Sequence, residues 1–362
     1  MASILKQDGL IGHGVSFSKE TVRGTNSNAR EQLSGVLREI RECSPLSGAL
    51  RHLKWRWSGD MMRDCIIIGG GPAGLTAAIY LARYHLSTTV FDDHSSRAAT
   101  IPISHNLAGF PEGISGRELL ARMRTQLQSY KVQIRSECVR QLQQEHDGFR
   151  VVSSRGSMRA RAVLLATGVT DRKPPMLAKR HDEAVARGLI RYCPVCDGFE
   201  VTDRRVAVIG CGSRAFAEAL FLRSYTTQVT IITPQEEHEL SEIEVDRLRD
   251  LQIGLQKGPI KSIDPERDVI RVATASGIGV FSSIYPALGS DARSKLAAMA
   301  GAELSENGCV IVDSHQRSTA PGLYAAGDVV IGLDQIGTAM GQAGIAATAI
   351  RNDLNEARHL AR

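Results

Sequence analysis

Short apolar runs, glycine-rich turns and helically spaced apolar residues follow one another along residues 64–93 of the chain. This segment reads DCIIIGGGPAGLTAAIYLARYHLSTTVFDD, which predicts an apolar strand, a tight turn, a helix and a second strand. The same order returns in residues 204–234, RRVAVIGCGSRAFAEALFLRSYTTQVTIITP. Because strands that alternate with helices usually form parallel sheets, the pattern predicts an α/β protein with two βαβ units.

The turn of the first unit carries glycines at the spacing GxGxxG, namely Gly69, Gly71 and Gly74. The first glycine allows a tight turn, the second lets the backbone approach a pyrophosphate, and the third lets helix and strand pack closely. The helix that follows offers free N–H groups and the positive end of its dipole. Asp92 ends the second strand, where a carboxylate can accept hydrogen bonds from ribose hydroxyls. We therefore expect a bound dinucleotide in this unit.

The second unit keeps the turn but changes its surroundings. Gly210 and Gly212 match the first two glycines, and Ala215 replaces the third. Thr233 stands where the first unit has its acid, and it is followed by three acids that would repel a phosphate, Glu236, Glu237 and Glu239. Arg214 could pair with a phosphate or obstruct the site. The unit thus leaves the use of NADPH or NADH open, and the residues that would contact either nucleotide are Gly210, Gly212, Ser213, Arg214 and Ala215.

Two of the seven cysteines, Cys193 and Cys196, form a pair at short spacing in the segment CPVCDGFE. Three interpretations are open: a metal site, inert structure or a redox-active pair. A structural zinc site needs further ligands at motif spacing that the sequence does not supply, and proline, aspartate and glycine favour a turn over a core position. The CxxC spacing lets two sulfurs form a disulfide within one turn, which favours redox chemistry. Asp197 follows directly and is either a general acid or base for the thiols or a solvated turn acid.

Composition narrows the class of protein. The 362 residues are 43% hydrophobic and 23% charged, an ordinary soluble composition with enough apolar material for two domains. No apolar run approaches the roughly 20 residues of a membrane helix, and a formal charge of +5 without a basic tract does not favour nucleic-acid binding. The odd, scattered set of cysteines argues against a secreted disulfide framework, and the isolated Cys65, Cys211 and Cys309 are expected to be buried. We expect a cytoplasmic protein that binds neither nucleic acid nor a membrane.

Residues 1–61 differ from the rest of the chain. The stretch SFSKETVRGTNSNAR is polar and aperiodic, which predicts disorder, while residues 33–40 have the apolar spacing of a short amphipathic helix. The segment lacks the long apolar core of a secretory signal. Translation could start at Met61 or Met62, which would make the extension dispensable, and the alternative is a regulatory or docking arm.

From about residue 62 onward the chain resembles the low-molecular-weight, bacterial-type thioredoxin reductases and related flavoproteins. The matching segments occur in the same order: IIIGGGPAGLTAAIYLAR, HNLAGFPEGISGREL, VLLATG, CPVCDGFE, VAVIGCGSRAFAEALFL and GLYAAGDV. The resemblance implies an α/β fold of two Rossmann-like three-layer domains, the second inserted into the first. An FAD-binding domain would span residues 62–172 and 285–362, and a NAD(P)-binding-like domain with the cysteine pair would span residues 173–284.

The resemblance also implies a site and a reaction, those of an FAD-dependent disulfide oxidoreductase. Cys196 would face the flavin, Cys193 would exchange with the substrate, and Asp197 would transfer the proton. The enzyme would be a homodimer whose inserted domain rotates, and its substrate would be a thioredoxin-like protein or a small-molecule disulfide. FAD would be held by Gly69, Gly71, Pro72, Ala73, Gly74, Asp92, Asn106, Thr167, Gly168, Gly327, Asp328, Gln335 and Ile336.

Three segments depart from the pattern of these reductases. Residues 233–235, Thr-Pro-Gln, replace a basic stretch, which motivates an alternative enzyme that oxidises dithiols or takes electrons from an iron–sulfur protein. Asp334 replaces an arginine before the last helix, and loss of that cation should make the flavin harder to reduce. Residues 95–106 replace a Gly-Gly-Gln stretch near the flavin and include His105, although a lone histidine is more often structural than catalytic. A third hypothesis is a flavin-bound sensor that docks a partner through residues 1–60.

Overall fold

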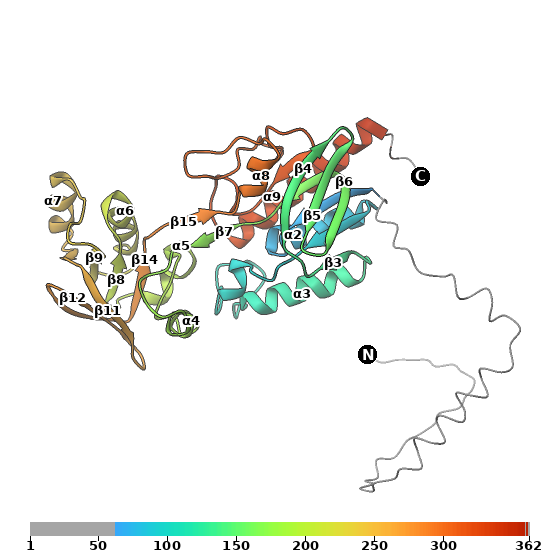
Figure 1. Cartoon of the computed structure of the whole chain (residues 1–362). Helices are drawn as coiled ribbons and strands as arrows, with labels where there is room; N and C mark the ends of the chain where they lie inside the picture. Colours follow the sequence, from blue (N-terminus) through green and yellow to red (C-terminus); the bar gives the residue numbers. More distant parts are fainter. Residues whose placement is uncertain (1–61, 359, 361–362) are drawn as a thin grey trace, which may run out of the picture. The chain divides into compact units, whose positions relative to one another are not determined.

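The structure, a computed structural model, describes residues 62–358 and 360 of the chain (Figure 1). The predictions made for residues 1–61, which are disorder, an amphipathic helix at 33–40 and a start at Met61, lie outside the described residues. Within the described part, no helix is long and apolar enough to span a membrane.

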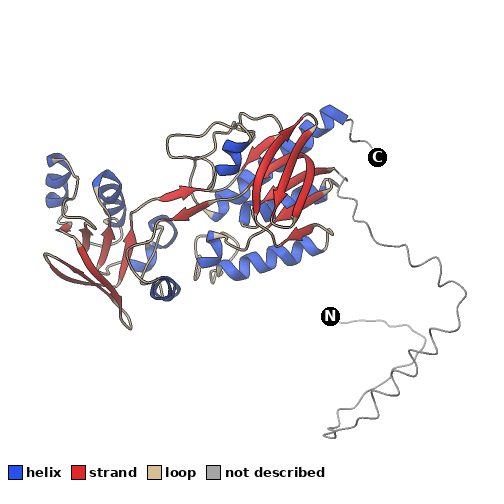
Figure 2. Cartoon of the chain, in the orientation of Figure 1, coloured by secondary structure: helices blue, strands red, loops and turns tan. Residues whose placement is uncertain are grey.

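One of two large sheets has seven strands (Figures 1 and 2). The strand order is β3-β2-β1-β6-β5-β4, and β16 also pairs with β6. Pairs are parallel except for β4 with β5 and β5 with β6. The strands are β1 (Arg63–Ile68), β2 (Thr88–Phe91), β3 (Gln133–Arg135), β4 (Val139–Glu145), β5 (Gly148–Ser153), β6 (Gly156–Leu165) and β16 (Leu323–Ala325).

Helices cover one face of this sheet, and they are α2 (Pro72–Arg83), α3 (Gly116–Gln128) and α9 (Ile336–Arg358). Ile67 of β1 and Leu164 of β6 pack into the core that these helices close. Ile66 and Leu165 point to the opposite core, which contains Phe149 of β5 and also part of α8 (Lys295–Met299). Because successive residues of one strand enter two different cores, the central strands read as continuous apolar runs.

The second large sheet has four parallel strands in the order β10-β9-β8-β14. These strands are β8 (Val206–Ile209), β9 (Val229–Ile232), β10 (Gly254–Gln256) and β14 (Ser283–Pro286). One core of this sheet includes side chains of two helices, α6 (Gly212–Leu222) and α7 (Glu242–Asp250). The other core includes side chains of α4 and of a three-stranded antiparallel sheet, with bounds α4 (Ala178–Ala186), β11 (Ile260–Pro265), β12 (Ile270–Thr274) and β13 (Gly277–Phe281).

The chain passes between the two large sheets twice. Strands β7 (Val169–Asp171) and β15 (Ser290–Ala292) lie in these passages and pair with each other in antiparallel register. The seven-stranded sheet takes its strands from residues 63–165 and 323–325, on both sides of the excursion, and the four-stranded sheet takes its strands from residues 206–286. The predicted fold class, two Rossmann-like α/β domains with the second inserted into the first, is confirmed, and the boundaries given above stay a prediction.

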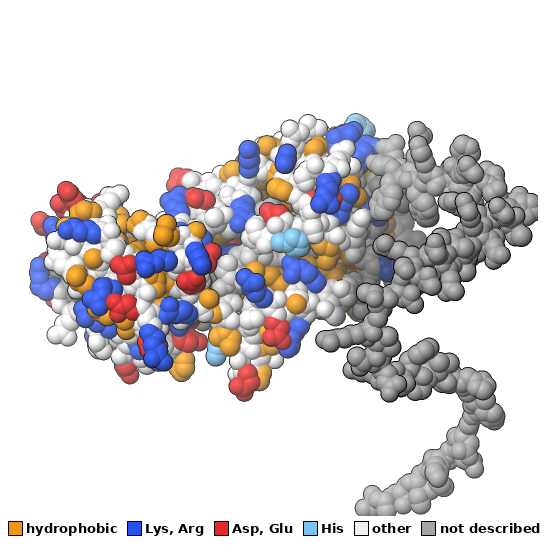
Figure 3. All heavy atoms as spheres, turned by 60° about the horizontal axis from the view of Figure 1, so that its bottom comes forward, with side chains coloured by type: hydrophobic (Ala, Val, Ile, Leu, Met, Phe, Trp, Pro, Cys, Tyr) orange, Lys and Arg blue, Asp and Glu red, His pale blue; other side chains and the backbone are white. Residues whose placement is uncertain are grey.

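Charged side chains of both signs are interspersed on the face of the molecule that Figure 3 shows. Lys and Arg side chains lie between Asp and Glu side chains over most of that face.

Candidate active site

A cavity of about 910 Å³ brings the first glycine turn and the cysteine pair into one space. Its volume lies near the upper end of the roughly 300–1,000 Å³ that ligand sites usually have. Cys193, Cys196 and Asp197 line it. The predicted FAD contacts also line it, with the exception of Gly74, and they are Gly69, Gly71, Pro72, Ala73, Asp92, Asn106, Thr167, Gly168, Gly327, Asp328, Gln335 and Ile336.

The glycines of the first turn have the separate roles that their spacing predicts. Gly69 has φ +120°, and a Cβ there would lie 2.1 Å from the carbonyl oxygen of Ala166. A Cβ on Gly74 would lie 1.9 Å from the carbonyl oxygen of Gly69, so helix and strand touch at this point. Gly71 is the N-cap of α2 and lines the cavity, where its backbone can approach a ligand. These features fit the pyrophosphate of a dinucleotide.

Asp92 lies at the end of β2 with an exposed fraction of 1%. Its carboxylate accepts hydrogen bonds from Arg124 at 2.9 Å and from the backbone N–H of His94 at 2.9 Å. A Cβ on the adjacent Gly70 would lie 2.1 Å from the carboxyl carbon, so this acid sits directly against the glycine turn. The acid is therefore held at the edge of the cavity, as a ribose-binding carboxylate requires.

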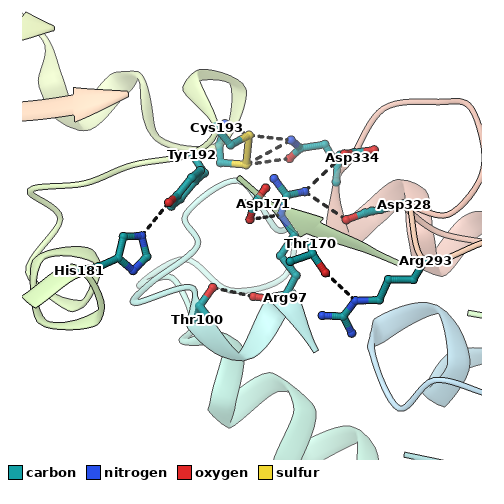
Figure 4. A network of polar contacts seen from close by, with 12 residues as sticks. Arg97, Thr100, Thr170, Asp171, His181, Tyr192, Cys193, Arg293, Asp328 and Asp334 are labelled. Atoms are coloured by element: carbon teal, nitrogen blue, oxygen red, sulfur yellow. Dashed lines mark hydrogen bonds and ion pairs between the residues drawn. A yellow bond between two sulfur atoms is a disulfide. The ribbon is translucent and has the colours of Figure 1, made fainter. Parts of the chain in front are cut away.

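The cysteines form a disulfide in the wall of this cavity (Figure 4). Cys193 is the N-cap of the short helix α5 (Pro194–Asp197), and its sulfur accepts the N–H of Cys196 at 3.1 Å. Gln335, just before α9, places its Nε2 at 3.2 Å from each sulfur. Asn106 donates to the Oε1 of Gln335 at 2.9 Å. A redox-active pair is the interpretation that this position favours, since the sulfurs face the space that the predicted FAD residues enclose.

Asp197 is close to the disulfide in sequence, but its carboxylate is engaged elsewhere. Its Oδ2 pairs with Arg191 at 2.9 Å, and its Oδ1 accepts the hydroxyl of Tyr285 at 3.1 Å. Burial raises the pKa of the Asp197 carboxyl, while the Arg191 guanidinium and the Tyr285 hydroxyl oppose that shift. A raised pKa suits a group that must carry a proton, but in this arrangement the carboxylate would have to leave Arg191 to reach a sulfur.

Arg97 is the residue that sequence reasoning missed. It lies in η2 (Arg97–Thr100), and its guanidinium contacts three carboxylates, Asp171 at 2.9 Å, Asp328 at 3.2 Å and Asp334 at 3.4 Å (Figure 4). Burial and the neighbouring Asp328 raise the pKa of Asp334 to about 6, and Arg97 opposes this shift. An arginine from another segment therefore lies beside position 334. The sequence contains a signal for this pair: two of the segments that depart from the reductase pattern carry opposite charges, Arg97 in residues 95–106 and Asp334 before the last helix.

His105, also in residues 95–106, is exposed and does not line the cavity.

The second glycine turn is arranged differently. None of Gly210, Gly212, Ser213, Arg214 and Ala215 lines the cavity. The N–H of Gly212, at the start of α6, donates to the backbone carbonyl of His238 at 2.8 Å. The hydroxyl of Thr233 donates to the carbonyl of Gln235 at 2.8 Å and accepts the N–H of Gly258 at 2.9 Å. The segment after β9 therefore returns to the second turn and satisfies the N–H of Gly212, which must exchange this partner before it can bind a phosphate.

The remaining cysteines of the described part are free. Cys65 is buried as predicted, whereas Cys211 and Cys309 are only half-buried. Within residues 62–358, no group of three or more His, Cys, Asp or Glu side chains is placed to hold a metal ion.

The two nucleotide-type sheets, the cavity and its disulfide correspond to one protein family. A family model described as "Pyridine nucleotide-disulphide oxidoreductase" matches residues 63–343. The chain belongs to this family. It is an FAD-dependent disulfide oxidoreductase of the thioredoxin-reductase type.

Curated relatives and solved structures support this assignment. The chain is 34% identical over 284 residues to the "Thioredoxin reductase" of Mycolicibacterium smegmatis, which covers 75% of this chain and 90% of that protein. It is 30% identical over 300 residues to the "Thioredoxin reductase" of Listeria innocua, with 80% and 93% covered. The crystal structure of thioredoxin reductase from Streptococcus pyogenes matches with a TM-score of 0.75 at 27% identity, covering 82% of this chain and 99% of the other.

Proposed function

We propose that this enzyme passes two electrons from FAD to the Cys193–Cys196 disulfide and on to the disulfide of a thioredoxin-like protein or a small molecule. The observation that carries the proposal is the disulfide in the wall of the cavity that the first glycine turn opens into. Bound FAD would supply two-electron transfer to the sulfurs. Gly69, Gly71 and Asp92 would hold its dinucleotide portion, and the start of α9 would face its ring system.

The exchange with a substrate then follows ordinary thiol–disulfide chemistry. The thiolate of Cys193 attacks a substrate sulfur, the substrate S–S bond breaks, and one substrate thiolate leaves and takes up a proton. Cys196 attacks the mixed disulfide, which restores the enzyme disulfide and releases the second thiol. In sum the enzyme dithiol gives two electrons and two protons to the substrate disulfide. Asp197, whose pKa is raised by burial, is our candidate for the group that moves one of these protons.

Exposed apolar side chains beside the disulfide favour a protein as the substrate. Val195 lies between the cysteines and has an exposed fraction of 42%, and Phe199 directly follows the turn with 81%. A large apolar side chain this exposed next to reacting atoms is typical of a docking surface. Delivery of Cys193 to such a partner would require the inserted domain to swing about its two passages, β7 and β15.

The test is a half-reaction in which no natural electron donor is needed. The FAD-loaded enzyme is reduced anaerobically with one equivalent of dithionite and mixed with oxidised thioredoxin. Return of the visible flavin absorption and formation of thioredoxin thiols are measured together. We expect stoichiometric transfer in the native enzyme and in Cys309→Ser, and no transfer in Cys193→Ser or Cys196→Ser. If Cys196→Ser still transferred its electrons to thioredoxin at the native rate, the proposal would be wrong.

A second candidate concerns the electron donor. The N–H of Gly212 is already bonded to the carbonyl of His238, which motivates the alternative of a donor other than NADPH or NADH, such as a small iron–sulfur protein, or the reverse flow of a dithiol oxidase. Anaerobic mixing of the pure enzyme with NADPH, with NADH and with a reduced ferredoxin separates these donors. Rapid bleaching of the flavin by either nicotinamide nucleotide at micromolar concentration would remove this candidate.

We also propose that the enzyme is a cytoplasmic homodimer. Tyr80 of α2, Tyr84 just after α2 and Ile345 of α9 have exposed fractions of 42%, 37% and 44%, which suits a contact with a second copy. Free cysteines are typical of a reducing compartment. Light scattering of the full chain measures the oligomeric state, and a monomer at micromolar concentration would refute the dimer.

A further inference from the structure

We propose that Gln335 is a catalytic residue of the disulfide step, because its side-chain N–H groups stabilise the thiolate that forms when the S–S bond of Cys193 and Cys196 breaks. Asn106 is the positioning residue that turns the amide of Gln335 toward the sulfurs. The inference rests on the proposed disulfide chemistry and adds to it a residue that sequence reasoning places among the FAD contacts.

The geometry places one amide group against both reacting atoms. The Nε2 of Gln335 lies 3.2 Å from the sulfur of Cys193 and 3.2 Å from the sulfur of Cys196. Nitrogen–sulfur contacts at this distance are hydrogen bonds, since sulfur accepts at longer range than oxygen. Among the described residues, no other side chain places an N–H within hydrogen-bond distance of either sulfur.

A chain of hydrogen bonds decides which way the Gln335 amide points. Asn106 donates its Nδ2–H to the Oε1 of Gln335 at 2.9 Å. The Nδ2 of Asn106 also donates to the backbone carbonyl of Val195 at 3.4 Å, and its Oδ1 accepts the hydroxyl of Ser104 at 3.0 Å. Because the Val195 carbonyl can only accept, the amide of Asn106 cannot turn over without losing this partner. Ser104 is 5% exposed, and its backbone N–H and carbonyl both pair with Ile114. The oxygen of Gln335 is therefore fixed on Asn106, and its N–H groups are fixed on the sulfurs.

The reaction develops charge where these N–H groups point. Reduction of the disulfide takes up two electrons and two protons, and the S–S bond breaks as the electron pair enters through one sulfur and the other leaves as a thiolate. A hydrogen bond to a charged acceptor is roughly twice as strong as one to a neutral acceptor, so Gln335 binds the thiolate better than the disulfide. Preorganised donors aimed at developing charge are a major source of catalysis.

The two sulfurs differ in how many donors they receive. Cys193 accepts from Gln335 and from the backbone N–H of Cys196 at 3.1 Å. Cys196 accepts from Gln335 alone and also lies 3.6 Å from the Oε1 of Gln335, an oxygen that does not stabilise a thiolate. Cys193 is therefore the better leaving thiolate in this arrangement, and Cys196 is the sulfur through which electrons enter. Asp197 does not compete for this role here, because its carboxylate is held by Arg191 and Tyr285.

The decisive measurements use the FAD-loaded full chain and do not depend on turnover. The first is the pH dependence of iodoacetamide alkylation of the dithiol enzyme, which gives the pKa of the more reactive thiol. The second is the equilibrium of the enzyme disulfide with dithiothreitol. The charged and titratable side chains that line the same cavity stay unchanged in every variant, and they include Arg97, Asp171, Arg191, Tyr192, Asp197, Glu200 and Asp334.

Gln335→Met removes the donor and keeps the length of the side chain. Because a hydrogen bond to a charged group contributes about tenfold or more, we expect alkylation at pH 7 to slow about tenfold and the equilibrium to shift about tenfold toward the disulfide. Gln144→Met, on the exposed side of β4, is the matched control and should match the native enzyme. FAD content and the circular dichroism of each variant report correct folding.

Asn106→Leu tests the positioning role with Gln335 intact and adds no charge. A leucine cannot donate to the Oε1 of Gln335, so the Gln335 amide is no longer held with its N–H groups toward the sulfurs. We expect the same direction of change in thiol pKa and disulfide equilibrium as in Gln335→Met. Native values in both Gln335→Met and Asn106→Leu would overturn the inference. Failure of the proposed function itself would be distinguishable, because the dithiol enzyme would then not reduce thioredoxin at all while the thiol pKa could still be measured.

Discussion

Glu218 of α6 has a carboxylate oxygen, Oε1, that is buried and has no hydrogen-bond partner among the described residues. Burial raises the pKa of Glu218 from 4.5 to about 7, with Arg214 lowering it and Asp197 raising it further. An unpartnered buried carboxylate is costly when it is charged, because the protein interior solvates the charge poorly. The change Glu218→Gln removes the ionisation and keeps the shape of the side chain.

The size and sign of the change in the free energy of unfolding follow from the pKa of Glu218 in the unfolded chain and in the folded protein. Between pH 4.5 and about 7 the unfolded chain releases the proton of Glu218 while the folded protein retains it, so the free energy of unfolding falls as pH rises and the loss is complete above pH 7. The difference between 4.5 and about 7 corresponds to roughly 3 kcal/mol, because one pKa unit is about 1.36 kcal/mol. Glu218 is half-buried as a whole, so screening by solvent reduces the expected loss to about 2 kcal/mol.

The assay is urea unfolding of the native enzyme and of Glu218→Gln at several pH values, followed by circular dichroism. At pH 8 we expect Glu218→Gln to be more stable by about 2 kcal/mol, and at pH 4.5 we expect the two proteins to be equal. Glu306→Gln in an exposed turn is the control and should follow the native enzyme at every pH. The reasoning fails if Glu218→Gln shows the native pH dependence, or if it is the less stable protein at pH 8.

Two further predictions concern the glycine turns. Gly74→Ala should lower bound FAD at least tenfold, measured by absorbance of the purified protein, because the new Cβ would lie 1.9 Å from the oxygen of Gly69 and push α2 off β1. Gly341→Ala, where a Cβ meets nothing within 4 Å, should keep native FAD content, and equal loss in both variants would contradict the explanation. Glu239→Gly should lower the KM for NADPH several-fold in initial-rate assays. Glu239 has φ +55°, which glycine adopts without strain, and its carboxylate lies 4.0 Å from where a Cβ on Gly212 would be, so the change removes a negative charge beside the turn. An unchanged KM would mean that the segment after β9 does not limit access.

Features set by the local backbone could be predicted from the sequence. The spacing of Gly69, Gly71 and Gly74 reports a tight turn and a close helix–strand contact, and both constraints act within six residues. The alternation of strand and helix likewise identifies both large sheets, because each βαβ unit is built from one continuous stretch of chain. The CxxC pair is local in the same sense, since Cys193 and Cys196 meet within one turn.

Side-chain partnerships across the fold could not be predicted in this way. Arg97 meets Asp171 and Asp328 across 74 and 231 residues of sequence, and Gln335 meets Cys193 across 142. Such contacts depend on where loops that leave different sheets come to lie, and no periodicity or spacing encodes that placement. The departure at Asp334 was visible in the sequence, but its meaning required the position of Arg97.

The two glycine turns show that the glycine motif specifies the backbone of the turn but not the segment that packs against it. Both turns follow an apolar strand and begin a helix, so the same local physics shapes their backbones. In the first, the strand after the helix ends in Asp92, and the turn stays open to the cavity. In the second, the strand is followed by a proline and a segment that returns to the turn, where His238 accepts the N–H of Gly212. Since backbone N–H groups at a helix start bind a phosphate through their free hydrogens, the bond from Gly212 to His238 has to be exchanged before this N–H can bind a nucleotide phosphate.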